Sequence, residues 1–489
     1  MGGDDPTPNP TPTPGSGSYL FYSGSISAVD PATPASPITV EAGTDVDFNI
    51  LEGVNKVFAG TYDAATKNLN NMHDHAIVYA KTNGKLYKVS ALKSSGTPTP
   101  TQLSSETAAD KICGWDGIAY DFANPDSSQI VYQTPGANTT CDDGDDVYKM
   151  VRLGMSAADA PVTAKHPIID LNDWAATGAL SGWLVNDAGA LKRCDASFAN
   201  CGASLKSIAS SAEWEDTVLG SNRILLNIDG ALYVYDGDAN TLSTALHTIG
   251  GTNPYVSYSV DDAAKFYFST SNAPNSIYAV PVDGSALATS LVTDVAGIND
   301  FDISDNKLLY TSATGIKVVA KTGGAASTLV TGTGTGIFQV SGNHVYYTLF
   351  NGAVPTAGMI DDDGSNKSEL ANADWIGSSV ATSWNLGASI VNVIQTITRA
   401  EGYETLGVDT GFVGATLRSF TTASKAEVGV LGKVPNDIVS IDCSEFFANG
   451  LCFGSDAASQ TDVFFVNSET PSSLVRVTNT PTKSEALIP

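Results

Sequence analysis

The sequence predicts an all-β fold, a β-propeller, from three observations. Short runs in which polar residues alternate with β-branched or aromatic ones recur along the chain, which is the pattern of half-buried strands. The runs form units with one internal order, spaced mostly at roughly 39–47 residues, the length of one propeller blade. Helical periodicity is almost absent, and only residues 371–375 indicate a short helical turn.

The clearest units follow one another and begin at Val256, Ile298 and Ile337. Each starts with an alternating strand and a polar turn. A strand rich in Tyr, Phe, Leu and Val comes next, then a strand of the Ile-Tyr-x-Val type and a final Leu-Val-Thr strand. Four short strands per unit predict one antiparallel sheet. A single sheet cannot bury both its faces, so its neighbours must cover them.

The second and third strands of this unit recur as about nine or ten candidate hairpins. Ordinary rings contain about 4–8 blades. We therefore expect a single propeller of about seven or eight four-stranded blades over residues 19–489, with the extra hairpins as insertions. A larger ring or two rings are the alternatives. We expect the first and last strands to share a sheet, which closes the circle and protects its edges.

Residues 1–18 read MGGDDPTPNPTPTPGSGS and predict a disordered tether. Alternating Pro and Thr favour an extended spacer, and the Gly-Ser end favours a flexible hinge. The stretch resembles the mature start of a bacterial surface lipoprotein, with Met1 in place of the lipidated Cys. This resemblance implies an extracytoplasmic protein at the bacterial outer surface or in the periplasm, lipid-anchored in its full-length precursor. An ordinary disordered tail is the alternative.

Two stretches resemble the blade repeat of TolB-like and related WD40-like bacterial propellers. Residues 359–370, MIDDDGSNKSEL, are similar to its Asp-Gly-Ser-Asn-x-x-x-Leu motif, and residues 277–284, IYAVPVDG, to the same blade. The resemblance implies a propeller and hardly any particular function. TolB carries a separate α/β domain that nothing here matches, so no role in the Tol system is implied.

Charge and hydropathy exclude several classes of partner. With 52 Asp and Glu against 25 Lys and Arg, the net charge is -27. This balance argues against nucleic acids and anionic lipid surfaces, which require basic patches. It favours basic or cationic partners. No apolar run is long enough to predict a transmembrane segment.

The six cysteines predict three disulfides and an oxidising compartment. Two pairs are close in sequence, and the remaining two cysteines pair by elimination. The predicted pairs are Cys194 with Cys201, Cys443 with Cys452, and Cys113 with Cys141. No Cys-x-x-Cys occurs, so the spacing of zinc ribbons and redox motifs is missing. Free buried thiols are the alternative.

No cofactor is predicted, although calcium is an alternative at two acidic turns. Clustered carboxylates suit calcium, but neither run fits an EF-hand, and a plain turn is the favoured interpretation. The acidic candidates are Asp142, Asp143 and Asp145, and Asp361, Asp362 and Asp363. His73 and His75 would share one strand face about 7 Å apart. They could start a zinc or copper site, but a solvated pair is favoured.

No local catalytic signature is present: there is no Gly-x-Ser-x-Gly, His-Glu-x-x-His or Walker motif. Trp115 and Trp214, flanked by polar residues, are candidates for ligand binding, with packing between blades as the alternative. We therefore expect a non-catalytic binding or scaffold protein that engages a protein or a glycan at the cell surface. The alternatives are a structural subunit of an envelope or extracellular assembly, and a hydrolase or lyase that uses channel carboxylates. The sequence makes no prediction of the oligomeric state.

Overall fold

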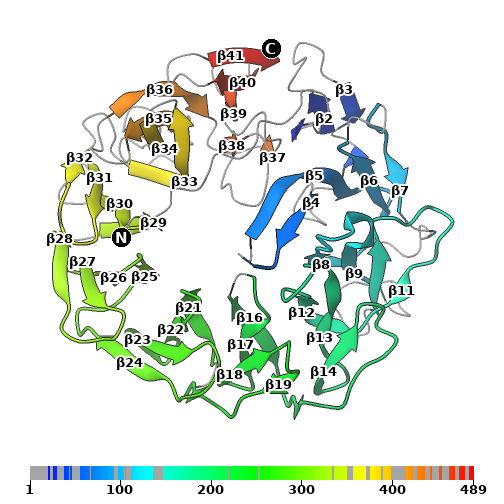
Figure 1. The fold of residues 1–489 in the computed structure, drawn as a ribbon, viewed down its shortest axis with the longest axis horizontal. Helices are drawn as coiled ribbons and strands as arrows, with labels where there is room; N and C mark the ends of the chain where they lie inside the picture. The colour runs from blue at the N-terminus through cyan, green and yellow to red at the C-terminus, as the bar shows by residue number, and fades with distance from the viewer. Residues whose placement is uncertain are drawn as a thin grey trace.

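The computed structural model describes most of the chain between residues 20 and 369 and the separate strands beyond. The described residues are 20–22, 26–29, 38–42, 45–46, 55–65, 68–92, 97–103, 105, 112–135, 147–218, 220–251, 254–332, 335–349, 356–369, 375–386, 389–397, 415–421, 427–434, 441–442, 451–453, 462–467, 473–478 and 484–488. They form ten antiparallel sheets, each with a path of four strands, arranged in a ring around a central opening (Figure 1). The predicted tether, residues 1–18, lies outside them.

Five sheets follow one another in the first part of the ring. Their strands are β4 (Asn55–Asp63), β5 (Asn68–Ala80), β6 (Leu86–Ser90) and β7 (Thr101–Gln102); β8 (Gly114–Ala119), β9 (Gln129–Thr134), β10 (Val147–Arg152) and β11 (Val162–Thr163); β12 (His166–Asn172), β13 (Leu180–Asn186), β14 (Ala190–Asp195) and β15 (Lys206–Ser207); β16 (Ala212–Thr217), β17 (Arg223–Ile228), β18 (Ala231–Asp236) and β19 (Thr241–Leu242), with β20 (His247–Thr248) also on β18; and β21 (Val256–Asp261), β22 (Lys265–Thr270), β23 (Ala273–Pro281) and β24 (Thr289–Thr293). A short 3₁₀ helix, Pro125–Ser127, precedes β9.

Five further sheets complete the ring. Their strands are β25 (Asp300–Ile303), β26 (Lys307–Ser312), β27 (Gly315–Ala320) and β28 (Ser327–Thr331); β29 (Thr335–Ser341), β30 (His344–Leu349), β31 (Thr356–Asp361) and β32 (Ser368–Glu369); β33 (Trp375–Leu386), β34 (Ser389–Ile397), β35 (Ala415–Thr421) and β36 (Glu427–Val434); β38 (Leu451–Phe453), β39 (Asp462–Asn467), β40 (Ser473–Thr478) and β41 (Ser484–Ile488); and β1 (Leu20–Tyr22), β2 (Ile26–Val29) and β3 (Ile38–Glu41) with β37 (Ile441–Asp442).

The predicted all-β propeller is confirmed, but the count of seven or eight blades is wrong. The described strands form ten sheets, because the candidate hairpins complete sheets of their own and none is an insertion into a neighbouring blade. The helical turn predicted near 371–375 is also absent at its one described residue, since Trp375 opens strand β33. No helix among the described residues has the length and apolarity needed to cross a bilayer.

The ring is closed by a sheet that joins distant parts of the chain. Phe21 of β1 pairs with Asp442 of β37, and Tyr22 pairs with Ile441. The closing strand is not the last one, because β38–β41 follow it and form a separate sheet. Figure 1 shows that sheet between β33–β36 and the closing sheet. The prediction of a shared closing sheet is therefore confirmed for the first strands but not for the final one.

The core lies between neighbouring sheets. Phe266 and Phe268 of β22, for example, pack with Leu225 of β17 and Val234 of β18 in the next sheet. Large aromatic side chains fill these layers, mostly from the second strand of a sheet, as the sequence pattern predicts. The largest fully buried side chains are Tyr79, Tyr132, Tyr235, Tyr267, Tyr310, Tyr346, Tyr347, Phe266 and Phe268.

Candidate functional site

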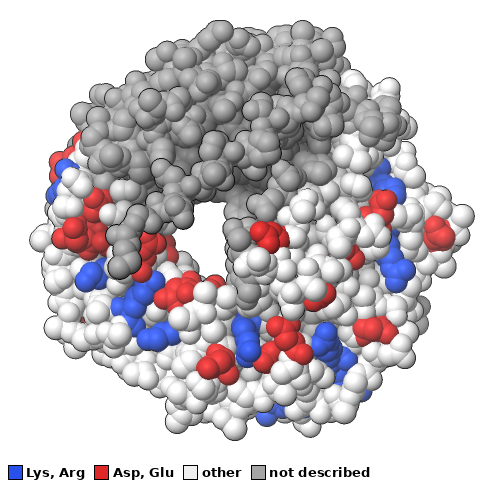
Figure 2. Space-filling view, viewed as in Figure 1, with Lys and Arg blue, Asp and Glu red and all other residues white. Residues whose placement is uncertain are grey.

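In the consecutive sheets from β4–β7 to β29–β32 the first strand lies nearest the central opening (Figure 1). Six of these strands, β8, β12, β16, β21, β25 and β29, contain no Lys or Arg but several acids. The acids are Asp116, Asp170, Glu213, Glu215, Asp216, Asp261, Asp300 and Asp302. On the face shown in Figure 2, acidic side chains border part of the opening and the basic ones lie further out. The inner surface of the ring is therefore negative over these strands.

Three consecutive inner strands concentrate this charge together with exposed aromatic rings. We call their side chains the inner acidic surface: Glu213, Trp214, Glu215 and Asp216 of β16, Tyr258 and Asp261 of β21, and Asp300 and Asp302 of β25. A bulge between Trp214 and Asp216 makes Glu215 an extra residue opposite β17. A bulge changes the direction of the side chains around it. Here it lies at Glu215, next to Asp216, so it affects two acids of β16.

Trp214 is the most exposed aromatic ring of this surface, with 53% of the residue accessible. Its Nε1 donates to Thr217 Oγ1 at 2.7 Å, which orients the indole. Tyr258 is 41% accessible and packs edge to face on Phe301, with ring centroids 4.8 Å apart. Exposed aromatic faces beside carboxylates are the two components of a site for ammonium or guanidinium groups.

The carboxylates of this surface are close enough to affect one another. Burial raises the pKa of Tyr258, and the charges of Asp302, Asp300 and Asp216 raise it further. Burial raises the pKa of Asp216 to about 6, with a contribution from Asp261. Burial also raises the pKa of Asp302 to about 6, with a contribution from Asp300. The three inner strands thus form one electrostatic unit with uncompensated negative charge.

Glu215 is the most strongly shifted carboxyl of the group. Burial raises its pKa to about 7, and the charges of Glu213 and Asp216 add to this effect. Hydrogen bonds from the Asn227 side chain and the Val256 N–H lower the pKa but do not outweigh burial. Glu215 Oε1 and Asp216 Oδ2 are enclosed and have no hydrogen-bond partner. Asn227 of β17 faces Glu215 and is 1% accessible, and its Oδ1 likewise has no partner. A buried acceptor without a donor lowers the stability of the folded protein. The inner acidic surface and Asn227 together have three such oxygen atoms.

The predicted calcium and histidine sites do not gather into a metal centre where the structure describes them. Among the described side chains no three His, Cys, Asp or Glu residues come together as ligands. Asp361 Oδ1 pairs with His344 Nδ1 at 2.7 Å, Asp362 Oδ2 accepts from Ser304 Oγ at 2.5 Å, and Asp363 Oδ1 accepts from Ser365 N at 2.8 Å. Of these contacts, the one from Ser304 crosses to the neighbouring sheet. The calcium site stays a prediction.

Several other predicted site residues are placed only in part. His75 Nε2 lies 3.2 Å from Asp126 Oδ1 of the next sheet, while the side chain of His73, on the same strand, is outside the description. Trp115 lies on inner strand β8, but its side chain is not among those that the structure describes. Asp142, Asp143 and Asp145 lie outside the described residues.

One predicted disulfide is present. Cys194 and Cys201 are bonded, with their Cα atoms 3.9 Å apart, and the loop between them places Phe198 on Trp183 at a centroid distance of 5.4 Å. Cys113 is also disulfide-bonded, while its predicted partner Cys141 lies outside the described residues. In the remaining predicted pair, Cys443 lies outside the described residues, and the structure describes only the backbone of Cys452.

Replacing Cys194 and Cys201 together with serine is expected to lower the free energy of unfolding by about 2–3 kcal/mol. The bridge closes a short loop, with a sequence separation of 7, and a loop of this size restricts the unfolded chain by about that amount. Urea unfolding of both proteins under oxidising conditions measures the difference. An unchanged midpoint and slope would contradict the prediction.

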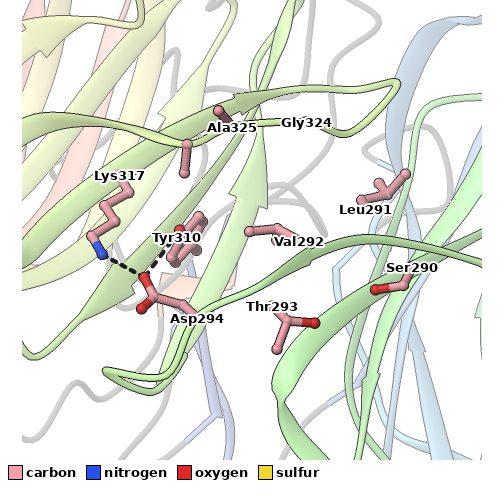
Figure 3. Close-up of a pocket in the computed structure, with 10 residues that line it drawn as sticks. Ser290, Leu291, Val292, Thr293, Asp294, Tyr310, Lys317, Gly324 and Ala325 are labelled. Atoms are coloured by element: carbon pink, nitrogen blue, oxygen red, sulfur yellow. Dashed lines mark hydrogen bonds and ion pairs between the residues drawn. The ribbon is translucent and has the colours of Figure 1, made fainter.

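A cavity of about 440 Å³ lies on the outer side of the ring, between the sheets β21–β24 and β25–β28. Figure 3 shows Asp294 in this cavity, where its Oδ2 accepts from Lys317 Nζ at 2.5 Å and from the Tyr310 hydroxyl at 3.1 Å. Asp294 is only 8% accessible. Its Oδ1 accepts from Ala296 N at 2.9 Å, so both oxygens are already hydrogen-bonded within the protein.

The same trio of tyrosine, carboxylate and lysine occurs twice more, once between the same two sheets and once between the sheets of β1–β3 and β4–β7. Asp262 Oδ2 accepts from the Tyr267 hydroxyl at 2.8 Å and from Lys321 Nζ at 3.0 Å. A third trio consists of Tyr79, Glu41 and Lys81. Each trio joins two neighbouring sheets, so we interpret the Asp294 cluster as a structural link and not as a binding site.

Comparisons with known proteins add little to this geometry. No protein-family model and no curated protein matches the chain. Among solved structures it is similar to the computationally designed Ika8 protein, at 13% identity over 87% of this chain and 98% of the other, with a TM-score of 0.38. It is also similar to a eukaryotic initiation factor, at 9% identity over 96% of both chains, with a TM-score of 0.46.

A third similar structure is PorZ, an essential bacterial surface component of the type-IX secretion system of Porphyromonas gingivalis. The identity is 11% over 89% of this chain and 59% of the other, with a TM-score of 0.27. At these identities and TM-scores the similarities carry no argument about function. The fold assignment rests on the ring of sheets itself.

Proposed function

We propose that this chain is a non-catalytic binding propeller that holds a basic polypeptide segment on its inner acidic surface. One observation carries the proposal: three consecutive inner strands present six carboxyl groups and two exposed aromatic rings, with no Lys or Arg of their own. Such a surface lacks the cations that would neutralise it, and a partner can supply them.

The chemistry of the surface favours arginine and lysine side chains over a neutral glycan. Guanidinium groups form charge-assisted hydrogen bonds with carboxylates and also stack on aromatic rings. Trp214, half-exposed and held by Thr217, offers such a ring on the strand that also carries Glu213 and Asp216. A neutral sugar could stack on Trp214, but it would leave the repulsion among the carboxylates unrelieved.

We also propose an extracytoplasmic location, at the bacterial outer surface or in the periplasm. The Cys194–Cys201 disulfide supports an oxidising compartment. The resemblances to TolB-like propellers and to lipoprotein tethers support the same proposal. Of the alternatives, a structural subunit of an assembly would associate with itself in light scattering. A hydrolase would turn over glycans or esters and lose that activity in Glu215→Gln.

The test is calorimetric titration with octa-arginine at low and high salt. We expect binding that weakens with salt, as contacts between exposed charges do. Asp300→Asn with Asp302→Asn should weaken binding about tenfold, and Trp214→Ala about threefold to thirtyfold, the size of a cation–π contact. The matched control is Asp283→Asn with Asp363→Asn, which removes two charges from exposed turns. Equal losses in both double variants would show unspecific attraction and contradict the proposal.

A further inference from the structure

Glu215 and Asn227 are in contact. Hydrogen bonds from the Asn227 side chain and the Val256 N–H favour the ionised carboxylate, but one oxygen of each side chain receives none. Glu215 Oε1 and Asn227 Oδ1 are enclosed and without a partner. The amide of Asn227 cannot simply be turned around, because its Nδ2 donates to the carbonyl oxygen of Pro254 at 3.2 Å. An ionised carboxylate has no proton to donate, whereas a protonated carboxyl has one.

Among the described residues, the charged groups that act on Glu215 are all negative. Glu213 and Asp216 lie beside it on β16, and Asp216 in turn faces Asp261 of β21. The cations of the two strands packed behind are engaged elsewhere. Arg223 of β17 pairs with Asp236 at 2.8 Å, and Lys265 of β22 donates to the carbonyl oxygen of Lys321 at 3.2 Å.

We propose that Glu215 is a proton-binding site that regulates the inner acidic surface. When Glu215 takes up a proton from solvent, its carboxyl donates to Asn227 Oδ1 and the surface loses negative charge. The basic segment is then released. When the proton leaves, the carboxylate returns and the surface binds a cationic partner again. The regulation of binding rests on the proposed function, because it needs the basic segment as ligand. The protonation of Glu215 does not depend on that function.

The pKa of Glu215 agrees with this assignment. Burial raises it to about 7, so the change of charge occurs between neutral and mildly acidic conditions. Asp216 follows at a lower pH, because burial raises its pKa to about 6. Its Oδ1 accepts from Thr217 N at 2.8 Å, while Oδ2 has no partner. Ordinary exposed carboxyls titrate near 4 and stay ionised throughout this interval.

The experiment measures octa-arginine affinity from about pH 8 to about pH 5.5, together with thermal unfolding of the free protein. Octa-arginine keeps its charge throughout, so any change belongs to the protein. The wild-type affinity should fall about tenfold at the acidic end. Glu215→Gln, which keeps the shape and can donate to Asn227, should bind weakly already at about pH 8 and vary less with pH. Glu213→Gln, an exposed neighbour, should weaken binding but keep the pH dependence.

The free protein tests the proton site without any ligand. Glu215→Gln should unfold at a higher temperature than the wild type near pH 8, and the difference should vanish near pH 5. A difference that does not change with pH would overturn the proton site. Binding that is equally strong at both ends of the pH range would overturn the regulation. Absence of octa-arginine binding at every pH would overturn the proposed function, and the regulation with it, while the unfolding curves still decide the proton site.

Discussion

Replacing Asp294 with alanine is expected to lower the free energy of unfolding by about 3–5 kcal/mol. The change leaves the Lys317 ammonium group and the Tyr310 hydroxyl without their acceptor between two sheets, and an uncompensated buried charge costs about this much. Burial alone would raise the pKa of Asp294, but the hydrogen bonds from Lys317, Ala296 and Tyr310 hold it below its usual range. Urea unfolding followed by tryptophan fluorescence measures the loss.

The control for this change is Asp283→Ala, an exposed acid whose removal should shift stability by less than about 0.5 kcal/mol. A second variant, Asp294→Leu with Lys317→Met, removes both charges and fills the space with apolar atoms. It should recover most of the loss, because paired buried charges can be replaced at little cost. A single variant as stable as the wild type would show that the trio does not connect the sheets.

The second large effect is an increase in stability as the pH falls from about 8 to about 5, by about 2–5 kcal/mol. In the folded state the pKa of Glu215 is raised from 4.5 to about 7, and the pKa values of Asp216 and Asp302 from 3.8 to about 6. The folded protein therefore holds more protons than the unfolded chain in this interval. Their stabilisation is complete below the unfolded pKa values and is lost as the pH rises through the folded ones. The range is discounted for the partial exposure of these groups.

Two histidines act in the opposite direction. Burial lowers the pKa of His166 and of His247, so both resist protonation in the folded state and stability is lost as the pH falls below about 6.5. Three acids with strongly raised pKa values oppose these two histidines, and we expect the acids to dominate. Below about pH 4 the carboxylates with lowered pKa values, such as Asp294 and Asp262, reverse the trend.

Calorimetric melting temperatures across this range measure the net effect, and stability should be greatest near pH 5. A triple variant with Glu215→Gln, Asp216→Asn and Asp302→Asn should flatten the curve between neutral pH and this maximum. If the wild type loses stability steadily on acidification from neutral pH, the prediction is wrong. Such a curve would mean that the three acids are solvated in the folded protein.

The sequence predicted the blades well because their signal is local. Alternation, turns and an aromatic second strand lie within one unit, and the structure has Tyr267 and Tyr310 buried on second strands as expected. The Cys194–Cys201 bridge was equally local. The number of blades was underestimated because it depends on how the sheets pack around the axis, and the usual ring size was given more weight than the number of hairpins.

The inner acidic surface could be predicted only in part. Trp214 stood out as a tryptophan flanked by polar residues, and it is exposed. Tyr258 and Asp302 did not stand out, because they reach this surface from other units through the packing of inner strands. The unpartnered Oδ1 of Asn227 has no signal in the sequence, since burial and partner count are properties of the folded chain.

The pairing of Tyr22 with Ile441 has a consequence for how the protein is made. During synthesis β1–β3 leave the ribosome with one edge open, and that edge stays open until residues 441–442 have emerged. An open strand edge is a template for mispairing with other chains. Until β37, at residues 441–442, pairs with β1, the nascent polypeptide therefore depends on chaperones or on rapid docking of β1–β3 against β4–β7.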